Sequence, residues 1–217
     1  MKRLLVLLAL SVLTLAIASA SPINCTVSTG VDNPVNNTTV VTCGDGLTFS
    51  NFAVDSPTGA GNPGVVDIIG ATYDSVTGAA DLSFNPNLQA SQDDEFLFQV
   101  SGGITSINME VGGQNASIQE TACSVPISTT TPGFCPLADT LGAITVASNT
   151  PSQPVYSTPF ATTSPVYIFK NINTQADGQL SEFTQSFETG TPEPVSMILL
   201  GSGLLGLGLL RRRSRKN

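Results

Sequence analysis

The middle of this 217-residue chain alternates short apolar runs with groups of Gly, Pro, Asn and Ser. In the run EFLFQV, the side chains of Phe96, Phe98 and Val100 share one face of an extended chain. Glu95 and Gln99 share the opposite face. This alternation is typical of a β-strand with one buried side. Helix signals are nearly absent from the whole middle of the chain, because it is rich in residues that favour strands and turns.

Segments of this kind recur at short intervals and are separated by turn-forming residues, which favours an all-β sandwich or barrel. About 170 residues are enough to bury a core between two sheets. We therefore expect a β-sandwich from Ser21 to Gly190. The predicted strands are Thr38–Thr42, Leu47–Val54, Val65–Tyr73, Ala80–Phe84, Glu95–Val100, Ile104–Val111, Ala143–Val146 and Pro165–Ile172.

The segment Leu180–Thr189, LSEFTQSFET, fits two kinds of structure. Phe183 and Phe187 follow Leu180 at helical spacing, but these two phenylalanines also lie on one face of a strand. The Thr and Phe content of the segment favours a strand. The prediction for this segment is therefore a strand.

The first twenty residues have a different pattern. Lys2 and Arg3 precede the apolar run Leu4–Ile17, and the small residues ASA follow it. A basic start, a short apolar run and an A-x-A site are the features of a secretory signal peptide. We predict cleavage between Ala20 and Ser21, and export of the rest of the chain. An uncleaved membrane helix is the less favoured alternative, because the run is short and small residues follow it.

The last 27 residues, 191–217, combine three elements. The triplet Pro192, Glu193 and Pro194 is stiff and extended, since each proline fixes its own φ and restricts the residue before it. As a helix, the apolar run Val195–Leu210 would extend about 24 Å, somewhat less than a ~30 Å hydrocarbon core. A basic cluster after a membrane helix holds that end of the helix on the cytoplasmic side, which would leave the body of the protein, residues 21–190, outside. This cluster consists of Arg211, Arg212, Arg213, Arg215 and Lys216.

This tail resembles the PEP-CTERM sorting signal of Gram-negative bacteria, whose Pro-Glu-Pro triplet, Gly-containing apolar span and basic cluster occur in the same order. The resemblance implies recognition by an exosortase, a membrane-embedded cysteine protease or transpeptidase. It also implies removal of the tail and delivery to the cell surface or the extracellular polymer matrix. The alternative is an ordinary membrane anchor, which explains the apolar run and the arginines but gives no role to Pro-Glu-Pro.

Charge is distributed unevenly along the chain. Lys170 is the only basic residue between Ser21 and Pro192, against fifteen acidic residues. A body this acidic is not expected to bind nucleic acid, because neutralising phosphates requires clustered Lys and Arg. The chain also has no His. This excludes catalytic triads with an imidazole base and His-ligated zinc or haem sites.

Export changes how the four cysteines are interpreted. The sequence contains no C-x-x-C motif, and no His is present to complete a zinc site. In an oxidising compartment two disulfides are expected. Four cysteines allow three pairings, and the short separations favour Cys25–Cys43 and Cys123–Cys135. Each loop would stabilise the fold by roughly 3 kcal/mol. Free buried thiols are the alternative.

Three features of the body suggest chemistry, and each has a structural alternative. The acidic run Asp93–Glu95 supplies oxygen ligands for Ca²⁺, but a solvated turn before a strand is the favoured interpretation. The segment Gly44–Gly46 is interpreted as a hairpin turn rather than a phosphate loop. Tyr73, Tyr156 and Tyr167 would stack on sugars if they formed a platform, although buried or edge positions are favoured.

No nucleophile and base stand out as a pair, and no cofactor is expected. We therefore predict a non-catalytic exported protein of the cell surface or extracellular matrix. The alternative is a carbohydrate- or Ca²⁺-binding adhesive module, and a hydrolase with paired carboxylates is a third class. The expected partners are signal peptidase, an exosortase, the inner membrane as a transient anchor, and exopolysaccharide.

Overall fold

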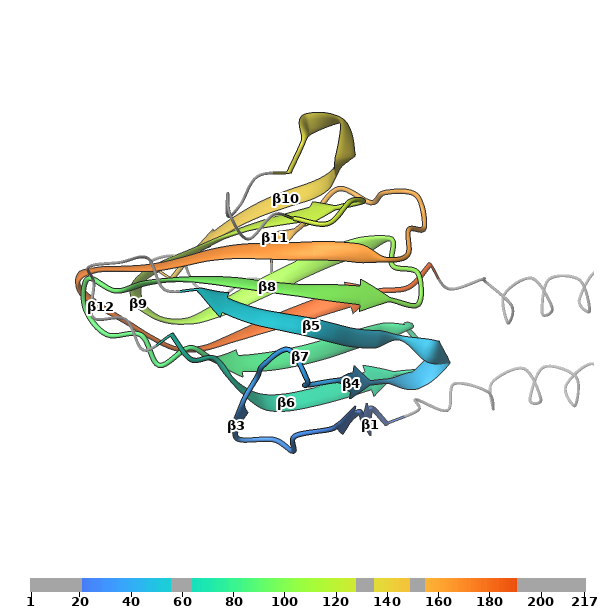
Figure 1. The fold of residues 1–217 in the computed structure, drawn as a ribbon, viewed down its shortest axis with the longest axis horizontal. Coiled ribbons are helices and arrows are strands. Elements are labelled where there is room, and N and C mark those ends of the chain that lie inside the picture. Colours follow the sequence, from blue (N-terminus) through green and yellow to red (C-terminus); the bar gives the residue numbers. More distant parts are fainter. Residues whose placement is uncertain (1–20, 56–63, 128–134, 149–154, 191–217) are drawn as a thin grey trace, which may run out of the picture.

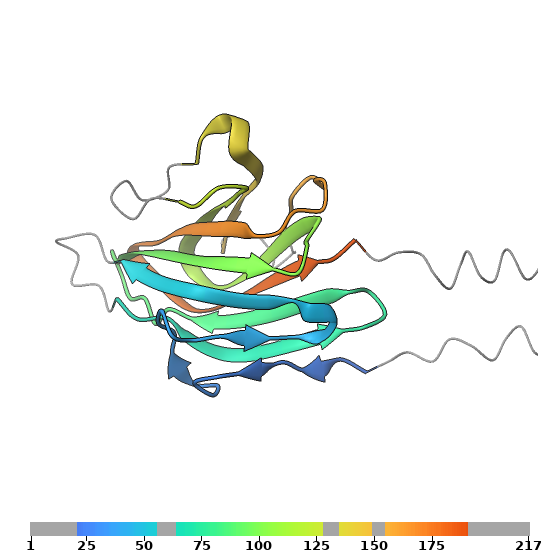
Figure 2. The same ribbon diagram turned by 45° about the vertical axis from the view of Figure 1, so that its right-hand side comes forward.

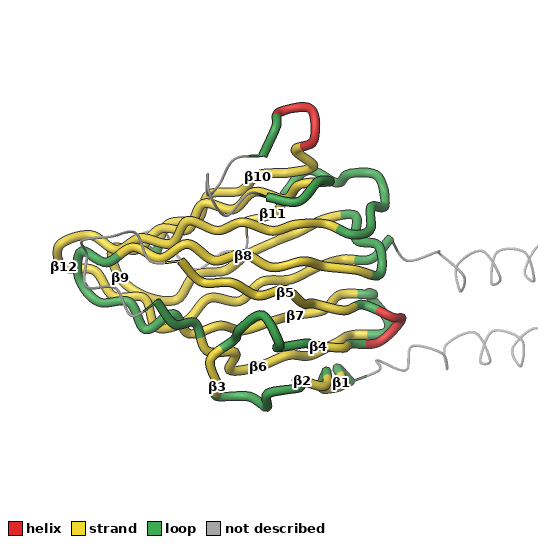
Figure 3. Tube along the Cα trace, viewed as in Figure 1, coloured by secondary structure: helices red, strands yellow, loops and turns green. Residues whose placement is uncertain are grey.

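The computed structural model describes residues 21–55, 64–127, 135–148 and 155–190, most of which form strands joined by loops and turns (Figure 3). The predicted signal peptide and the predicted sorting tail lie outside the described residues. None of the described residues forms a helix long and apolar enough to cross a membrane. The strands are β1 (Ile23–Asn24), β2 (Thr26–Val27), β3 (Asn33–Pro34), β4 (Val41–Thr42), β5 (Thr48–Asp55), β6 (Asp67–Asp74), β7 (Ala79–Asn85), β8 (Asp93–Ser101), β9 (Ser106–Cys123), β10 (Thr140–Ala147), β11 (Val155–Tyr156) and β12 (Val166–Glu188).

Two long strands, β9 and β12, connect the two layers of a sandwich. Residues 166–173 of β12 pair with β8, whereas residues 183–188 pair with β7. β9 runs antiparallel to β12 through both halves. Figures 1 and 2 show β12 running through one layer, bending, and returning through the other. The predicted β-sandwich is therefore confirmed, with the addition that two strands belong to both layers.

The two layers are named here after their central strands. The β8 layer contains β2, β4, β5, β8, the first half of β12, the second half of β9, and β10. The β7 layer contains β1, β3, β6, β7, the second half of β12, the first half of β9, and β11. All of these pairings are antiparallel.

Glycines form the corner at which β9 and β12 pass between the layers. The register of the two strands is interrupted between Thr174 and Gln179. Gly113 has a φ of +150°, and a Cβ on it would lie 2.4 Å from the carbonyl oxygen of Gln179. A Cβ on Gly178 would lie 2.5 Å from the carbonyl oxygen of Asn115. Because real Cβ atoms do not approach this closely, the corner requires glycine at both positions.

Phenylalanines from both layers meet between the sheets. Phe49 of β5 lies 4.9 Å from Phe187 of β12, and Phe84 of β7 lies 5.1 Å from Phe96 of β8, measured between ring centroids. Rings at these separations and at tilted angles gain favourable contacts beyond their buried area. The alternation seen in the sequence therefore places the apolar side chains in the shared core.

Most predicted strands are present, but two are much longer than expected. The strand predicted at Ile104–Val111 continues to Cys123, and the one predicted at Pro165–Ile172 continues to Glu188. The second of these strands includes most of the segment that also had helical spacing, so the strand interpretation is confirmed there. The hairpin turn at Gly44–Gly46 is confirmed as well, because β4 and β5 pair on either side of it.

The structure contains two disulfides, Cys25–Cys43 and Cys123–Cys135. These are the pairings that the short sequence separations favour. No free cysteine remains among the described residues. Two disulfides in a small β-domain are typical of proteins that fold in an oxidising compartment, such as the periplasm or the extracellular space.

The first and last described strands, β1 and β12, belong to the same layer, the β7 layer, where β6 and β7 lie between them. Ile23 of β1 pairs with Tyr73 of β6, which pairs with Ala80 of β7, which in turn pairs with Phe187 of β12. Both ends of the described body consequently lie at the same end of the sandwich (Figures 1 and 2).

Candidate functional site

The outer face of the β7 layer is polar. The alternation that turns Phe183, Gln185 and Phe187 inward turns Thr184 and Ser186 outward. Register pairing then aligns four side chains of this outer face across four strands, of which Asn108 is largely covered, at 8 % exposed. They are Asp81 of β7, Ser186 of β12, Asn108 of β9 and Tyr156 of β11. This row exists because β9 and β12 bring strands distant in sequence into one sheet.

A hollow of about 250 Å³ lies over this row. Tyr156 stands at its edge on the short strand β11 and is 61 % exposed, the largest exposed fraction of the three tyrosines. Apart from the tyrosine, the hollow is lined by carboxylates, an amide and hydroxyls. We call it the Tyr156 hollow, and its lining residues are Asp81, Asn108, Glu110, Tyr156, Thr184 and Ser186.

The Tyr156 hollow is negative and has free hydrogen-bonding capacity. Within the described part of the chain, neither the Asp81 nor the Glu110 carboxylate has a hydrogen-bond partner. Thr184 shares a 3.0 Å hydrogen bond with Ser83, and this fixes one wall. Lys170, the only basic residue in the described ranges, is fully buried elsewhere. No cation among these residues neutralises the two carboxylates.

These groups suit a neutral ligand with many hydroxyl groups. Carboxylates and an amide oxygen accept hydrogen bonds from hydroxyls, and the asparagine amide nitrogen donates them. A tyrosine ring offers a flat apolar surface with a polar tip. A concave site with a few convergent polar groups is the usual form of a small-ligand site. Phosphorylated or carboxylated ligands would be repelled.

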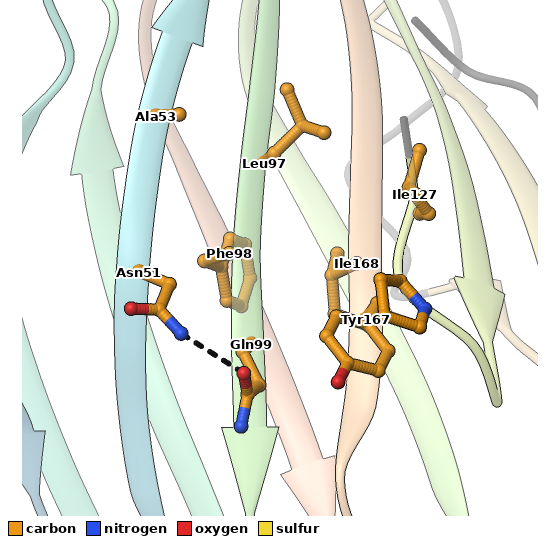
Figure 4. Close-up of a pocket in the computed structure, with 9 residues that line it drawn as sticks. Asn51, Ala53, Leu97, Phe98, Gln99, Ile127, Tyr167 and Ile168 are labelled. Atoms are coloured by element: carbon orange, nitrogen blue, oxygen red, sulfur yellow. Dashed lines mark hydrogen bonds between the residues drawn. The ribbon is translucent and has the colours of Figure 1, made fainter. Parts of the chain in front are cut away.

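A second hollow, of about 180 Å³, lies on the outer face of the β8 layer. Figure 4 shows Asn51, Leu97 and Tyr167 on three neighbouring strands, with Ile127 beside them. Asn51 donates a 2.9 Å hydrogen bond to Gln99, so part of its amide is already engaged. The lining is largely aliphatic, which makes this hollow a weaker candidate for a polar ligand.

The three tyrosines do not form the platform considered from the sequence. Tyr73 is buried and donates a hydrogen bond to Asp45. Tyr156 lies on the outer face of the β7 layer, and Tyr167 lies on the outer face of the β8 layer. The favoured expectation of buried or edge positions fits Tyr73 and Tyr156.

The acidic run Asp93–Glu95 is not a turn before a strand, so that interpretation was wrong. The three residues begin β8, and Asp94 is fully buried between Asp93 and Glu95, which face outward. Burial raises the pKa of Asp93, and burial together with the nearby charges of Asp55 and Asp93 raises that of Glu95. Among the described residues no three Asp, Glu or Cys side chains converge where they could hold a metal ion.

A polar cluster that was not expected from the sequence lies in the core. Lys170 of β12 and Glu120 of β9 are register partners, both fully buried and facing inward. The Nζ atom of Lys170 contacts Oε2 of Glu120, and both side chains contact the buried side chain of Gln185 from the β7 layer. One signal in the sequence could have indicated this cluster, because the single lysine of the body occupies an inward position of an apolar strand.

No protein-family model matches the chain, and no curated protein matches its sequence. Among solved structures, TmCBM61 in complex with β-1,4-galactotriose is similar over 63% of this chain and 88% of its own, with 13% identity and a TM-score of 0.35. A structure from work on the promiscuous specificity of carbohydrate-binding modules of the β-sandwich superfamily covers 79% of this chain and 97% of its own. That match has 13% identity and a TM-score of 0.22. Both likenesses are distant.

Proposed function

We propose that the chain is a non-catalytic exported protein of the cell surface or extracellular matrix, and that it binds neutral polysaccharide in the Tyr156 hollow. The observation that carries this proposal is the convergence of an exposed tyrosine with the carboxylates of Asp81 and Glu110 and the amide of Asn108. Hydroxyl groups of a sugar pair with the polar groups, and its C–H face rests on the tyrosine ring.

The negative charge of the body favours neutral over anionic polysaccharides. The described body has one basic residue, and that residue is buried in the core. A uronate- or sulfate-bearing chain would therefore meet unshielded negative charge and no partner for its own anions. Binding of a neutral chain is expected to depend little on ionic strength, because no counterions are exchanged.

Titration of the protein with a panel of neutral and anionic polysaccharides tests this proposal. Tyr156→Ala should weaken binding of a neutral polysaccharide by about tenfold, equivalent to about 1.4 kcal/mol. Tyr167→Ala, on the opposite outer face, is the matched control and should leave affinity unchanged. Equal losses in both variants, or binding of anionic chains alone, would contradict assignment of the ligand to this hollow.

Sorting is the second part of the proposal. The Pro192-Glu193-Pro194 triplet, the apolar run and the basic cluster support processing by an exosortase of a Gram-negative host, after signal peptidase has removed residues 1–20. The mass of the protein isolated from its host should then correspond to a chain that starts at Ser21 and lacks Val195–Asn217. A retained tail would instead indicate a permanent membrane anchor.

A further inference from the structure

The buried cluster of Lys170, Glu120 and Gln185 brings together a nucleophile, an acyl group and a proton carrier. The Nζ atom of Lys170 contacts Oε1 of Gln185 and Oε2 of Glu120. The leaving nitrogen of the carboxamide, Nε2 of Gln185, donates a 2.9 Å hydrogen bond to Oε1 of Glu120. One carboxyl group therefore contacts the attacking nitrogen with one oxygen and the leaving nitrogen with the other.

The surroundings of this cluster are apolar and closed to bulk solvent. All three side chains are fully buried, and Sδ of Met109 lies 3.5 Å from the lysine Nζ. The ring centroids of Phe183 and Phe98 lie 5.3 and 6.0 Å from the same atom. A site closed to bulk solvent favours acyl transfer between two side chains, because hydrolysis competes less.

Burial also favours the uncharged form of both ionisable groups. It lowers the pKa of Lys170 and raises that of Glu120, while attraction between the two opposes both shifts. Charged groups are expensive to hold in an apolar interior, even as a pair. A neutral amine is the form that attacks a carbonyl carbon, and a protonated carboxyl group can supply the proton that the leaving nitrogen needs.

We propose that Lys170 and Gln185 become joined by an intramolecular amide bond, with Glu120 carrying the proton. Nζ attacks Cδ of Gln185 and forms the new C–N bond, and one Nζ proton passes to Oε2 of Glu120. The carboxyl group gives a proton from Oε1 to Nε2, the bond between Cδ and Nε2 breaks, and ammonia leaves. The products are a secondary amide and ammonia, and Glu120 ends in its starting state.

The same geometry favours Gln185 over Glu120 as the acyl donor. Exchange of one amide for another requires a proton on the leaving nitrogen, which Glu120 is placed to supply, and the leaving group is then neutral ammonia. Joining the lysine to Glu120 would expel hydroxide or water from a carboxyl group and would leave no general acid between the two nitrogens. The new bond would link the two halves of β12, and so would connect the two layers of the sandwich.

The sequence provides a direct test, since Lys170 is the only trypsin site between Arg3 and Arg211. Trypsin does not cleave after an acylated lysine. The full-length protein should be unfolded in denaturant, reduced and digested. If the amide bond is present, the body stays in one piece and weighs less than its sequence mass by one ammonia.

Digestion at glutamates locates the bond. Cleavage after Glu182 and Glu188 isolates Gln185 in the short peptide 183–188. The inference requires that this peptide remain attached to the one that contains Lys170. Cleavage of the wild-type body at Lys170 would overturn the inference, and so would a loss of water with Glu120 as the attached residue.

Two variants test the acyl group and the proton carrier separately. Gln185→Met removes the acyl group, and Glu120→Gln removes the proton carrier at similar volume. Both should restore cleavage at Lys170 and the full sequence mass. Gln119→Ala changes the exposed neighbour of Glu120 on β9 and should resist trypsin as the wild type does. A Gln185→Met chain that still resists trypsin after denaturation would also exclude the proposed bond.

Discussion

Tyr73 illustrates how one buried polar atom ties a strand to a turn. The residue is 1 % exposed, and its hydroxyl donates a hydrogen bond to Asp45 in the turn between β4 and β5. Burial, followed by the hydrogen bond and charge of Asp45, raises the pKa of Tyr73 to about 12. The folded protein therefore holds this proton more tightly than the unfolded chain does.

The raised pKa of Tyr73 predicts a loss of stability in alkali. A tyrosine in the unfolded chain ionises near pH 10, whereas Tyr73 in the folded protein does so near pH 12. The stabilising contribution is complete below pH 10 and is lost as the pH rises toward 12, by about 1–2 kcal/mol. Urea unfolding at several pH values would measure this loss.

Tyr73→Phe is the control for this effect. It removes the hydroxyl but keeps the ring, so its free energy of unfolding should lack the additional decline between pH 10 and 12. Absorbance titration of tyrosinate should lose its last phase in the same variant. If that phase persists in Tyr73→Phe, the late ionisation belongs to another tyrosine.

At the scale of elements, the shared corner of β9 and β12 should be the most sensitive part of the backbone. Gly113→Ala places a Cβ 2.4 Å from the carbonyl oxygen of Gln179, at a φ of +150°. We expect a loss of about 2–4 kcal/mol in the free energy of unfolding, since backbone atoms of both strands must move. Denaturant unfolding followed by far-ultraviolet circular dichroism measures it.

Gly112→Ala is the matched control one residue away. Its Cβ would lie 3.5 Å from the nearest atom, the carbonyl oxygen of Glu182, which is an ordinary contact. The expected change is within about 0.5 kcal/mol. Similar losses in the two variants would mean that the corner tolerates a side chain and that another feature bends the strands.

The strands were predictable because their signal is local. In β7 the side chains of Ala80, Leu82 and Phe84 are buried and those between them are not, as the alternation requires. The corner was not predictable, because Gly113 and Gly178 matter only when β9 and β12 lie side by side. The sequence pattern therefore predicted short strands where the chain forms two long, bent ones.

The Tyr156 hollow could not be found for the same reason. Its residues come from β7, β9, β11 and β12, and Tyr156 belongs to a strand of two residues with no recognisable pattern. The polar cluster in the core was partly predictable from the sequence. A lysine at an inward position of an apolar strand must find a buried partner, but Glu120 and Gln185 become neighbours only in the folded sandwich.

At the scale of the whole molecule, the excess of acidic groups should make the body more stable in mild acid than at neutral pH. Asp93 and Glu95 have pKa values raised above those of the unfolded chain. Their contribution is complete below the ordinary carboxyl range and is lost as the pH rises through the folded values. We expect the thermal midpoint at about pH 4.5 to exceed that at pH 7 by a few degrees.

Salt provides an independent check of this electrostatic effect. At pH 7, sodium chloride should raise the thermal midpoint by screening repulsion between carboxylates. Glu95→Gln should reduce both the pH dependence and the salt dependence, because it removes a charge beside Asp55 and Asp93. A thermal midpoint that falls on acidification would contradict the shifts assigned to these groups.

The position of β12 has a mechanical consequence. A protein held by its C-terminal end and pulled by a chain bound beside Tyr156 would carry the load through the second half of β12, which pairs with β7 on one edge and with β9 on the other. Force along this strand shears many hydrogen bonds at once and does not open them one by one. β1, which is paired over two residues, would instead peel away under a small force, but only as far as Cys25, which is disulfide-bonded to Cys43. Tension from the C-terminal end is thus resisted by the paired second half of β12, and tension from the N-terminal end is passed to the Cys25–Cys43 disulfide.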